Sequence, residues 1–142
     1  MLYTALTRKA ITLCFEAHKN QLDKSGLPYV FHPFHLAEQM PDEDCIITAL
    51  LHDVMEDTDY SLEDIRLLGF SEDVLTALVL LTHCDDTPYL DYVSKLKGNR
   101  IARTVKLADL RHNSDLSRLE SVTEKDLARV EKYKRAIAIL EL

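Results

Sequence analysis

Four ionisable residues end an apolar stretch of this sequence. The residues from Cys45 to Leu51 are almost entirely apolar, and they are followed at once by His52, Asp53, Glu56 and Asp57. If the helix continues through them, residues three and four apart share a face, so we predict that these four lie together across two turns. Burying an imidazole and carboxylates at the end of an apolar helix is costly unless a cation compensates their charge.

A divalent cation would provide that compensation. His52 and Asp53 are common ligand types, whereas Glu56 and Asp57 lie one turn further on, where they could hold or deprotonate an attacking water molecule. An adjacent His-Asp pair alone is also common at surfaces and helix caps, so the prediction depends on the full pattern of His-Asp followed by Glu-Asp.

Two more ligands would have to come from distant segments. His32 directly precedes Pro33 at the start of a predicted helix, and Asp109 is a lone carboxylate after a mostly apolar stretch. Together with His52 and Asp53 they supply two nitrogens and two oxygens, a mixture that suits Mn²⁺, Fe²⁺ or Zn²⁺ better than Ca²⁺ or Mg²⁺. Positions left for water and substrate would make such a site catalytic rather than structural.

The composition favours an all-α fold. The chain has 142 residues, 46% of them hydrophobic, with only three Gly and four Pro. This length suits one domain, which we take as residues 1–142, and so few turn residues disfavour a β-sandwich or barrel. Apolar residues recur at helical spacing nearly throughout, which predicts a single helical bundle of about six to eight helices.

The predicted elements follow from spacing, caps and breakers. A loop containing Gly26 and Pro28 connects the first two helices. Ser61, Ser71 and Thr123 are predicted N-caps. The expected helices cover about 3–19, 32–40, 42–57, 62–69, 72–82, 88–98, 99–119 and 124–142.

Charge and targeting signals limit the class of protein. The net charge is −7, which argues against a nucleic-acid partner. Cys14, Cys45 and Cys84 are odd in number and widely spaced, as expected for reduced thiols. The sequence has no apolar run of the ~20 residues needed to span a membrane, and its first residues do not resemble a signal peptide. We therefore expect a soluble cytoplasmic protein without a membrane partner.

Acids and bases are unevenly distributed along the chain. Residues 42–73 contain eleven acids and one base, whereas residues 95–118 contain seven bases and two acids. An acidic segment that favours a metal and a basic segment that favours anions would suit a phosphorylated substrate. The alternative is that the two segments are solvated helix faces that differ in sign.

Three motifs, in order, resemble the HD superfamily of metal-dependent phosphohydrolases, and most closely the hydrolase domain of the Rel/SpoT alarmone enzymes and their small stand-alone relatives. Residues 25–33 are similar to the family's Gly-x-Pro-Tyr-x-x-His-Pro loop, and residues 49–58 to its Leu-His-Asp-x-x-Glu-Asp-Thr helix. Residues 105–109, followed by His112 and Asn113, are similar to its Lys-x-Ala-Asp and His-Asn segment. The similarity extends from the first helix to about Arg118.

The resemblance implies a function and a set of site residues. It implies one Mn²⁺ per chain, with Zn²⁺ or Fe²⁺ as alternatives, bound by His32, His52, Asp53 and Asp109. It implies that Glu56 and Asp57 act on the attacking water, and that Lys24, Ser25 and Asn113 contact a small-molecule nucleotide. The implied reaction removes the 3′-pyrophosphate from ppGpp or pppGpp, and the implied protein is a stand-alone hydrolase.

The sequence departs from the family pattern near the nucleotide. Asp23 occupies the place of an Arg, and Leu110-Arg111 reverses the usual order of a base and a Leu. These departures leave the metal ligands intact but bear on base recognition. The alternatives are therefore a hydrolase of another nucleotide, such as a 5′-mononucleotide or the 2′-phosphate of NADPH, or a non-catalytic regulator that binds metal and nucleotide. The sequence also leaves a homo-oligomer open.

Overall fold

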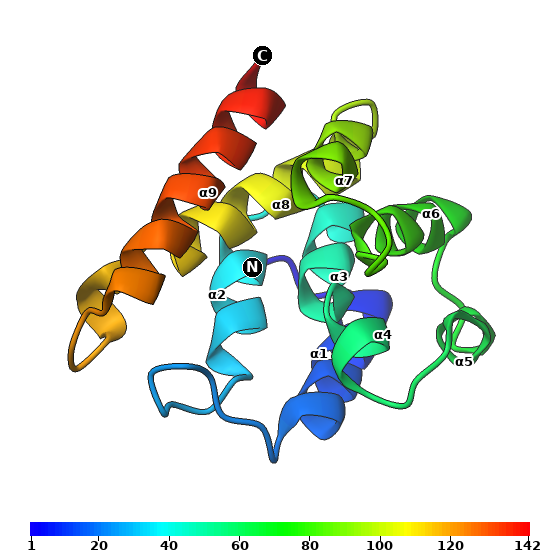
Figure 1. The fold of residues 1–142 in the computed structure, drawn as a ribbon. Helices are drawn as coiled ribbons and strands as arrows, with labels where there is room; N and C mark the ends of the chain where they lie inside the picture. The colour runs from blue at the N-terminus through cyan, green and yellow to red at the C-terminus, as the bar shows by residue number, and fades with distance from the viewer.

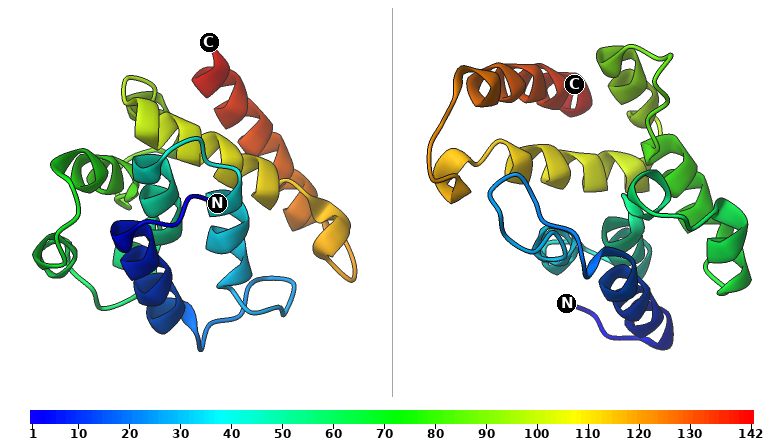
Figure 2. Two further views of the ribbon diagram at one scale, coloured as in Figure 1. Left: turned by 180° about the vertical axis from the view of Figure 1, so that it is seen from behind. Right: turned by 60° about the horizontal axis from the view of Figure 1, so that its bottom comes forward.

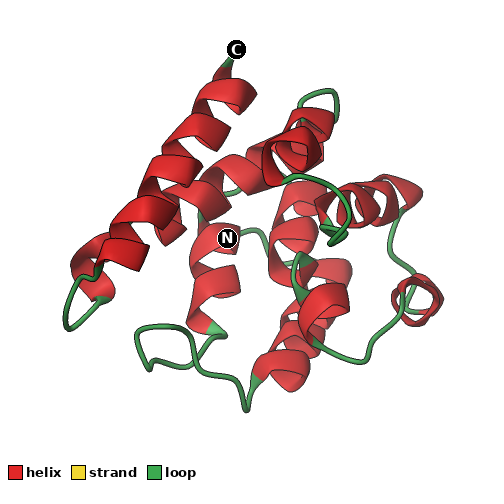
Figure 3. Cartoon of the chain, viewed as in Figure 1, coloured by secondary structure: helices red, strands yellow, loops and turns green.

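The computed structural model, which describes residues 1–142, confirms the all-helical prediction (Figures 1 and 3). Its only β pairing is an isolated bridge between Leu22 and Pro28. No helix combines the length and apolar character needed to cross a membrane. The elements are α1 (Ala5–His18), α2 (Phe31–Glu38), α3 (Glu43–Leu51), α4 (Val54–Asp57), α5 (Leu62–Leu67), α6 (Glu72–Leu81), α7 (Tyr89–Leu96), α8 (Arg100–Asn113), η1 (Leu116–Arg118) and α9 (Glu124–Glu141).

Helix α3 lies at the centre of the core. Every residue from Cys45 to Leu51 is buried, and the helix packs against α1, α2, α6 and α8. Asp42 caps its first turn by accepting a hydrogen bond from the Cys45 N–H at 2.9 Å, which satisfies one of the unpaired donors of the helix start. Because α3 is buried on all sides, its C-terminal end brings His52 into the interior.

Helix α9 runs along α8 on the side of the molecule away from α1, as two views show (Figures 1 and 2). Ala136 and Leu140 of α9 are fully buried. The Arg103 side chain in α8 donates to the Leu140 carbonyl, and Arg111 forms an ion pair with Glu141 at 2.6 Å. The apolar contacts and these two polar ones attach α9 to the bundle.

The continuous helix predicted through Asp57 is interrupted at His52 and Asp53, where the chain makes a turn before α4. In a continuous α-helix the Ala49 carbonyl would accept the Asp53 N–H. Here that carbonyl accepts a hydrogen bond from the His52 ring at 2.6 Å, a side-chain contact that competes with helical pairing. The prediction that the four ionisable residues share one helix face was therefore wrong.

The long helix predicted over 99–119 is also shorter than expected. Helix α8 ends at Asn113, and a separate 3-10 turn, η1, follows. Asp115 starts that turn by accepting hydrogen bonds from the backbone and hydroxyl of Ser117. This local capping replaces the helical bonds, and it turns the chain so that Leu116 and Arg118 reach the cavity described below.

Candidate metal centre and cavity

His52 presents a buried ring nitrogen that lacks a hydrogen-bond partner. Its Nδ1–H donates to the Ala49 carbonyl, so in the neutral ring Nε2 carries a lone pair. Nε2 is buried without a hydrogen bond and lies 3.1 Å from Asp53 Oδ2 and 3.7 Å from Asp109 Oδ1. A lone pair that faces two carboxylates is unfavourable by itself, but it is the arrangement that a shared cation would stabilise.

His32 and Asp109 complete a compact set of ligand atoms. His32 Nε2 lies 2.9 Å from Asp109 Oδ1, and its Nδ1 lies 2.7 Å from His112 Nδ1. One ligand atom from each of His32, His52 and Asp109 lies within 4.8 Å of the others. The structure therefore brings together three of the four predicted ligands from α2, the turn after α3, and α8.

Asp109 is held in its charged form by the residues around it. Burial alone would raise its pKa, but the Lys106 ammonium and the hydrogen bond with His32 hold the pKa well below its usual range. Lys106 Nζ donates to Oδ2 at 2.9 Å, and Asn113 Nδ2 donates to Oδ1 at 2.9 Å. Asn113, which the sequence predicted as a substrate contact, orients Asp109 through this hydrogen bond.

Asp53, the fourth predicted ligand, lies beside this set. Tyr29 donates a short hydrogen bond from its hydroxyl to Asp53 Oδ2, the same oxygen that lies near His52. Burial, followed by the charges of Asp109 and Asp57, raises the pKa of Asp53 well above its usual value. Two carboxylates close together in a buried site repel one another when both are charged, and a cation between them would relieve that repulsion. The role of Asp53 as a ligand stays a prediction.

The predicted catalytic pair is not arranged as a pair. Asp57 lines the cavity, and its carbonyl accepts from the Gln21 side chain at 3.0 Å. Glu56 does not line the cavity; its carboxylate accepts from the His83 N–H at 2.5 Å, in the loop after α6. Both residues belong to α4, and neighbouring residues of an α-helix project about 100° apart, so Asp57 faces the cavity and Glu56 does not.

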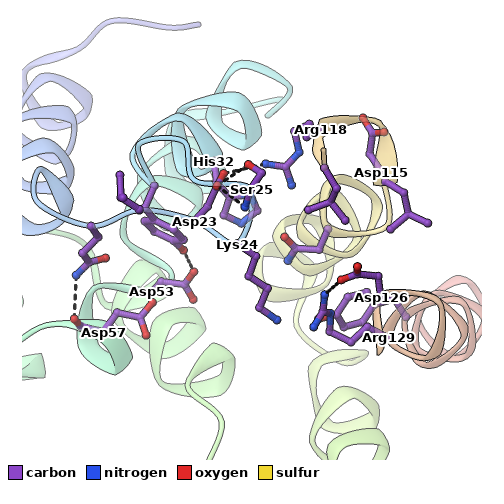
Figure 4. A pocket seen from close by; sticks show the side chains of 17 residues that line it. Asp23, Lys24, Ser25, His32, Asp53, Asp57, Asp115, Arg118, Asp126 and Arg129 are labelled. Atoms are coloured by element: carbon purple, nitrogen blue, oxygen red, sulfur yellow. Dashed lines mark hydrogen bonds and ion pairs between the residues drawn. The ribbon is translucent and has the colours of Figure 1, made fainter. Parts of the chain in front are cut away.

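A cavity of about 520 Å³ opens beside the candidate metal ligands (Figure 4). It lies between the loop that joins α1 and α2, the start of α4, the end of α8, η1 and α9. Lys24, Ser25 and Asn113, the three predicted substrate contacts, all line it. So do His32, Asp53 and Asp57, so one of the two predicted water-activating residues and two of the predicted ligands line a single cavity.

The cavity-lining residues that were not predicted from the sequence include Arg118 from η1, and Arg129 and Tyr133 from α9. Arg129 forms an ion pair with Asp126. The motif similarity ended at about Arg118, and no spacing signal pointed from α9 toward the cavity. An isolated Arg and Tyr on an amphipathic helix are common without any ligand, so only the packing of α9 on α8 reveals their position.

Asp23 is not a free acid in this cavity. Its Oδ1 accepts hydrogen bonds from the Ser25 N–H, the Ser25 hydroxyl and the Leu27 N–H, and its Oδ2 pairs with Arg118 at 3.2 Å. Burial would raise the pKa of Asp23, but these hydrogen bonds and the Arg118 charge lower it. The acid that departs from the family pattern is thus neutralised by a guanidinium 95 residues away.

No family model matches the chain. The similar curated proteins are named as enzymes that make or hydrolyse (p)ppGpp. The chain is 32% identical over 142 aligned residues to a GTP pyrophosphokinase of Myxococcus xanthus, covering 88% of this chain and 18% of the relative. It is 30% identical to the bifunctional (p)ppGpp synthase/hydrolase SpoT of Escherichia coli, covering 75% of this chain and 17% of the relative. It is 43% identical over 63 residues to the guanosine-3′,5′-bis(diphosphate) 3′-pyrophosphohydrolase of Aquifex aeolicus, covering 42% of this chain and 9% of the relative.

The chain therefore spans less than a fifth of the length of these curated relatives. A solved structure, described as a metazoan orthologue of SpoT that hydrolyses ppGpp, has a similar fold. Its TM-score is 0.71 at 24% identity, and the match covers 99% of this chain and 94% of that one.

Proposed function

Because this chain is a Rel/SpoT-like domain of the HD type, we propose that it is a metal-dependent hydrolase that removes the 3′-pyrophosphate from ppGpp or pppGpp. The observation that carries the proposal is the convergence of His32, His52 and Asp109 beside a cavity that is lined by both His32 and Lys24. A candidate metal site beside a cavity whose wall carries an unpaired ammonium suits a phosphorylated ligand.

The donor set fits one divalent cation. We propose Mn²⁺, since two imidazole nitrogens with carboxylate oxygens suit a first-row transition metal, with Fe²⁺ and Zn²⁺ as the alternatives. The buried and unpartnered Nε2 of His52 supports this assignment. When bound, the cation would offset negative charge on the phosphoryl oxygens and lower the pKa of a nearby water molecule.

Asp57 is the group that we expect to accept a proton from the attacking water, since its side chain lines the cavity. In the proposed reaction the water oxygen bonds to the phosphorus attached to the 3′ oxygen, and the bond between that phosphorus and the 3′ oxygen breaks. The 3′ oxygen is protonated, and pyrophosphate leaves. Lys24 would bind phosphate oxygens of the substrate through a charge-assisted contact.

The test is an assay of purified protein on ppGpp with Mn²⁺, followed by identification of the products. We expect GDP and pyrophosphate in equal amounts, and no turnover after treatment with a chelator. Absence of product with Mn²⁺, Fe²⁺ and Zn²⁺ would contradict the proposal. Release of orthophosphate from a 5′-mononucleotide or NADPH, without pyrophosphate from ppGpp, would favour the alternative substrates instead.

A further inference from the structure

We propose that His18 and Gln21 are positioning residues that hold α4, and with it the Asp57 carboxylate, against the wall of the cavity; their effect on turnover rests on the proposed function. His18 is the last residue of α1, and Gln21 lies in the loop that leads to α2. Two hydrogen bonds run in series from the His18 ring through the Gln21 amide to the backbone of Asp57. A dashed line in Figure 4 marks the bond that reaches Asp57.

Helix α4 has few contacts of its own to hold it in place. It consists of four residues, of which only Val54 is buried. Asp53, at its start, makes no capping hydrogen bond with its side chain. Because a single helical turn is not stable in isolation, the direction in which Asp57 points depends on contacts between α4 and the rest of the molecule.

The Gln21 side chain supplies such a contact. Its Nε2 donates to the Asp57 carbonyl at 3.0 Å, across 36 residues of sequence. Carbonyl groups in the last turn of a helix have no partner within the helix, and Asp57 is the last residue of α4. The bond therefore satisfies an acceptor that α4 cannot satisfy, and it does so at the residue whose side chain lines the cavity.

The Gln21 amide is itself held in one orientation. Because its Nε2 faces a carbonyl oxygen, Nε2 must be the donor, and Oε1 then accepts from His18 Nδ1 at 2.8 Å. Rotating the amide by half a turn would place two oxygens against one another. The backbone is fixed as well, since the Gln21 N–H donates to the His18 carbonyl at 3.0 Å and the Tyr29 N–H donates to the Gln21 carbonyl at 2.9 Å.

His18 makes no side-chain hydrogen bond except the one with Gln21. The residue is 1% exposed, and its Nε2 is buried without a partner. Its ring packs on the Tyr29 ring, with the centroids 4.8 Å apart. His18 does not line the cavity, so it does not contact a ligand there. What the His18 ring does in this structure is to orient the Gln21 amide.

This arrangement bears on turnover through the position of Asp57. A general base has to lie within hydrogen-bond reach of the proton it accepts, about 2.6–3.2 Å, and a misplacement of about 1 Å can lower a rate about 10²-fold. Neither His18 nor Gln21 forms a hydrogen bond with a proposed metal ligand. We therefore expect the pair to affect kcat and to leave the affinity for Mn²⁺ unchanged.

The experiment compares His18→Phe and Gln21→Met in the full chain, with ppGpp and saturating Mn²⁺. His18→Phe keeps an aromatic ring against Tyr29 and removes the Nδ1–H, whereas Gln21→Met removes both polar ends of the amide. Each should lower kcat about 10- to 100-fold and leave the Kd for Mn²⁺ unchanged. The double variant should be no slower than Gln21→Met alone, because two bonds in series produce one shared effect.

His18→Asn separates the hydrogen bond from the packing of the ring. The Asn amide nitrogen can replace Nδ1 as the donor to Gln21, so this variant should recover part of the kcat that His18→Phe loses, although it lacks the ring. Lys19→Met is the matched control, because this exposed neighbour pairs only with Glu16 and should change nothing. Melting temperatures close to that of the unchanged protein establish that each variant is folded.

Hydrogen exchange, measured by mass spectrometry with Mn²⁺ present, tests the position of α4 without turnover. The N–H groups of Asp57 and Thr58 make the helical bonds of α4, and they should exchange about 5- to 10-fold faster in His18→Phe and Gln21→Met. Unchanged exchange would overturn the inference, as would equal kcat in His18→Phe and His18→Asn, or losses that multiply in the double variant. Faster exchange in both variants, with no turnover of ppGpp by the unchanged chain, would refute the proposed function and support the positioning of α4.

Discussion

Tyr29 links the loop between α1 and α2 to the candidate metal ligands. Its hydroxyl donates to Asp53, and its ring lies between His18 and His32, with centroids 4.8 and 5.7 Å away. Because the ring is held on both sides, the hydroxyl has little freedom and fixes the orientation of the Asp53 carboxylate. Residues that orient a ligand in this way strongly affect metal affinity.

We therefore predict that Tyr29→Phe weakens Mn²⁺ binding by about 10-fold or more. The ring and its packing remain, so stability should change little. Titration of the metal-free variant with Mn²⁺, compared with Tyr60→Phe as a control on a tyrosine that does not line the cavity, measures the effect. Unchanged affinity in Tyr29→Phe would show that the hydroxyl does not position Asp53 for the metal.

Asp57 and Glu56 differ in position, and we expect their variants to differ in activity. Asp57 lines the cavity, whereas Glu56 is engaged with the His83 N–H. Loss of a general base typically reduces the rate by about 10²- to 10⁴-fold, so Asp57→Asn should lower kcat within that range and retain the metal. Glu56→Gln should lower kcat less. If the two losses are equal, Glu56 must turn into the cavity during the reaction.

His112 makes the metal-free protein sensitive to acid. Burial and the nearby positive charges of His32 and Arg118 lower the pKa of His112 from 6.5 to about 4. The unfolded chain then binds the proton more readily than the folded chain does, so the free energy of unfolding should fall as the pH decreases from 6.5 to about 4. Melting temperatures of chelator-treated protein across this range should fall less for His112→Asn. An equally steep fall in the variant would assign the effect to other groups.

At the level of single residues, the sequence predicted three of the side chains that converge, but not the hydrogen bonds and ion pairs that hold them. His52 and Asp109 were predicted because each ends a mostly apolar segment, and His32 because it precedes Pro33 at the start of a predicted helix. The contact between Asp23 and Arg118 could not be predicted, since it spans 95 residues and depends on where η1 turns. The orientations of Asp53 and Glu56 depend on a break in the helix that the apolar spacing does not reveal.

The sequence predicted most of the helices and several of their N-cap residues, but it did not predict where a helix is interrupted. Ser61, Ser71 and Thr123 cap α5, α6 and α9, as the sequence indicated. The interruption after α3 arises because the His52 ring competes for the Ala49 carbonyl. An apolar pattern with helical spacing reports which side of a helix is buried, but it contains no information about such side-chain competition for backbone groups.

Helix α9 contributes to the cavity wall but supplies none of the proposed metal ligands. Weakening its packing should therefore affect stability and nucleotide binding without affecting metal binding. Leu140 is fully buried, and Leu140→Ala should lower the free energy of unfolding by about 2–5 kcal/mol. The variant should bind nucleotide more weakly and keep the same Mn²⁺ stoichiometry. Urea unfolding and metal titration measure the two quantities. Leu142→Ala, at a residue that is 88% exposed, is the control and should change neither; loss of Mn²⁺ in Leu140→Ala would contradict the separation.

At the scale of the whole molecule, the proposed metal site and nucleotide site each form where segments that are distant in sequence meet. The proposed cation would lie between α2, the turn after α3, and α8, whereas the nucleotide would lie between the loop after α1, η1 and α9. The acidic and basic segments seen in the sequence do not form two separate surfaces at this site. Asp53 and Asp57 from the acidic segment and Asn113 and Arg118 near the end of the basic one line the same cavity.

Titration of metal-free protein with Mn²⁺ tests this account most directly. We expect one ion per chain, with binding at least about 10- to 100-fold weaker in His52→Asn and Asp109→Asn. His83→Asn, which alters a histidine outside the cavity, should bind like the unchanged protein. Equal binding by all four proteins, or none by the unchanged chain, would contradict the claim that these three segments hold a cation.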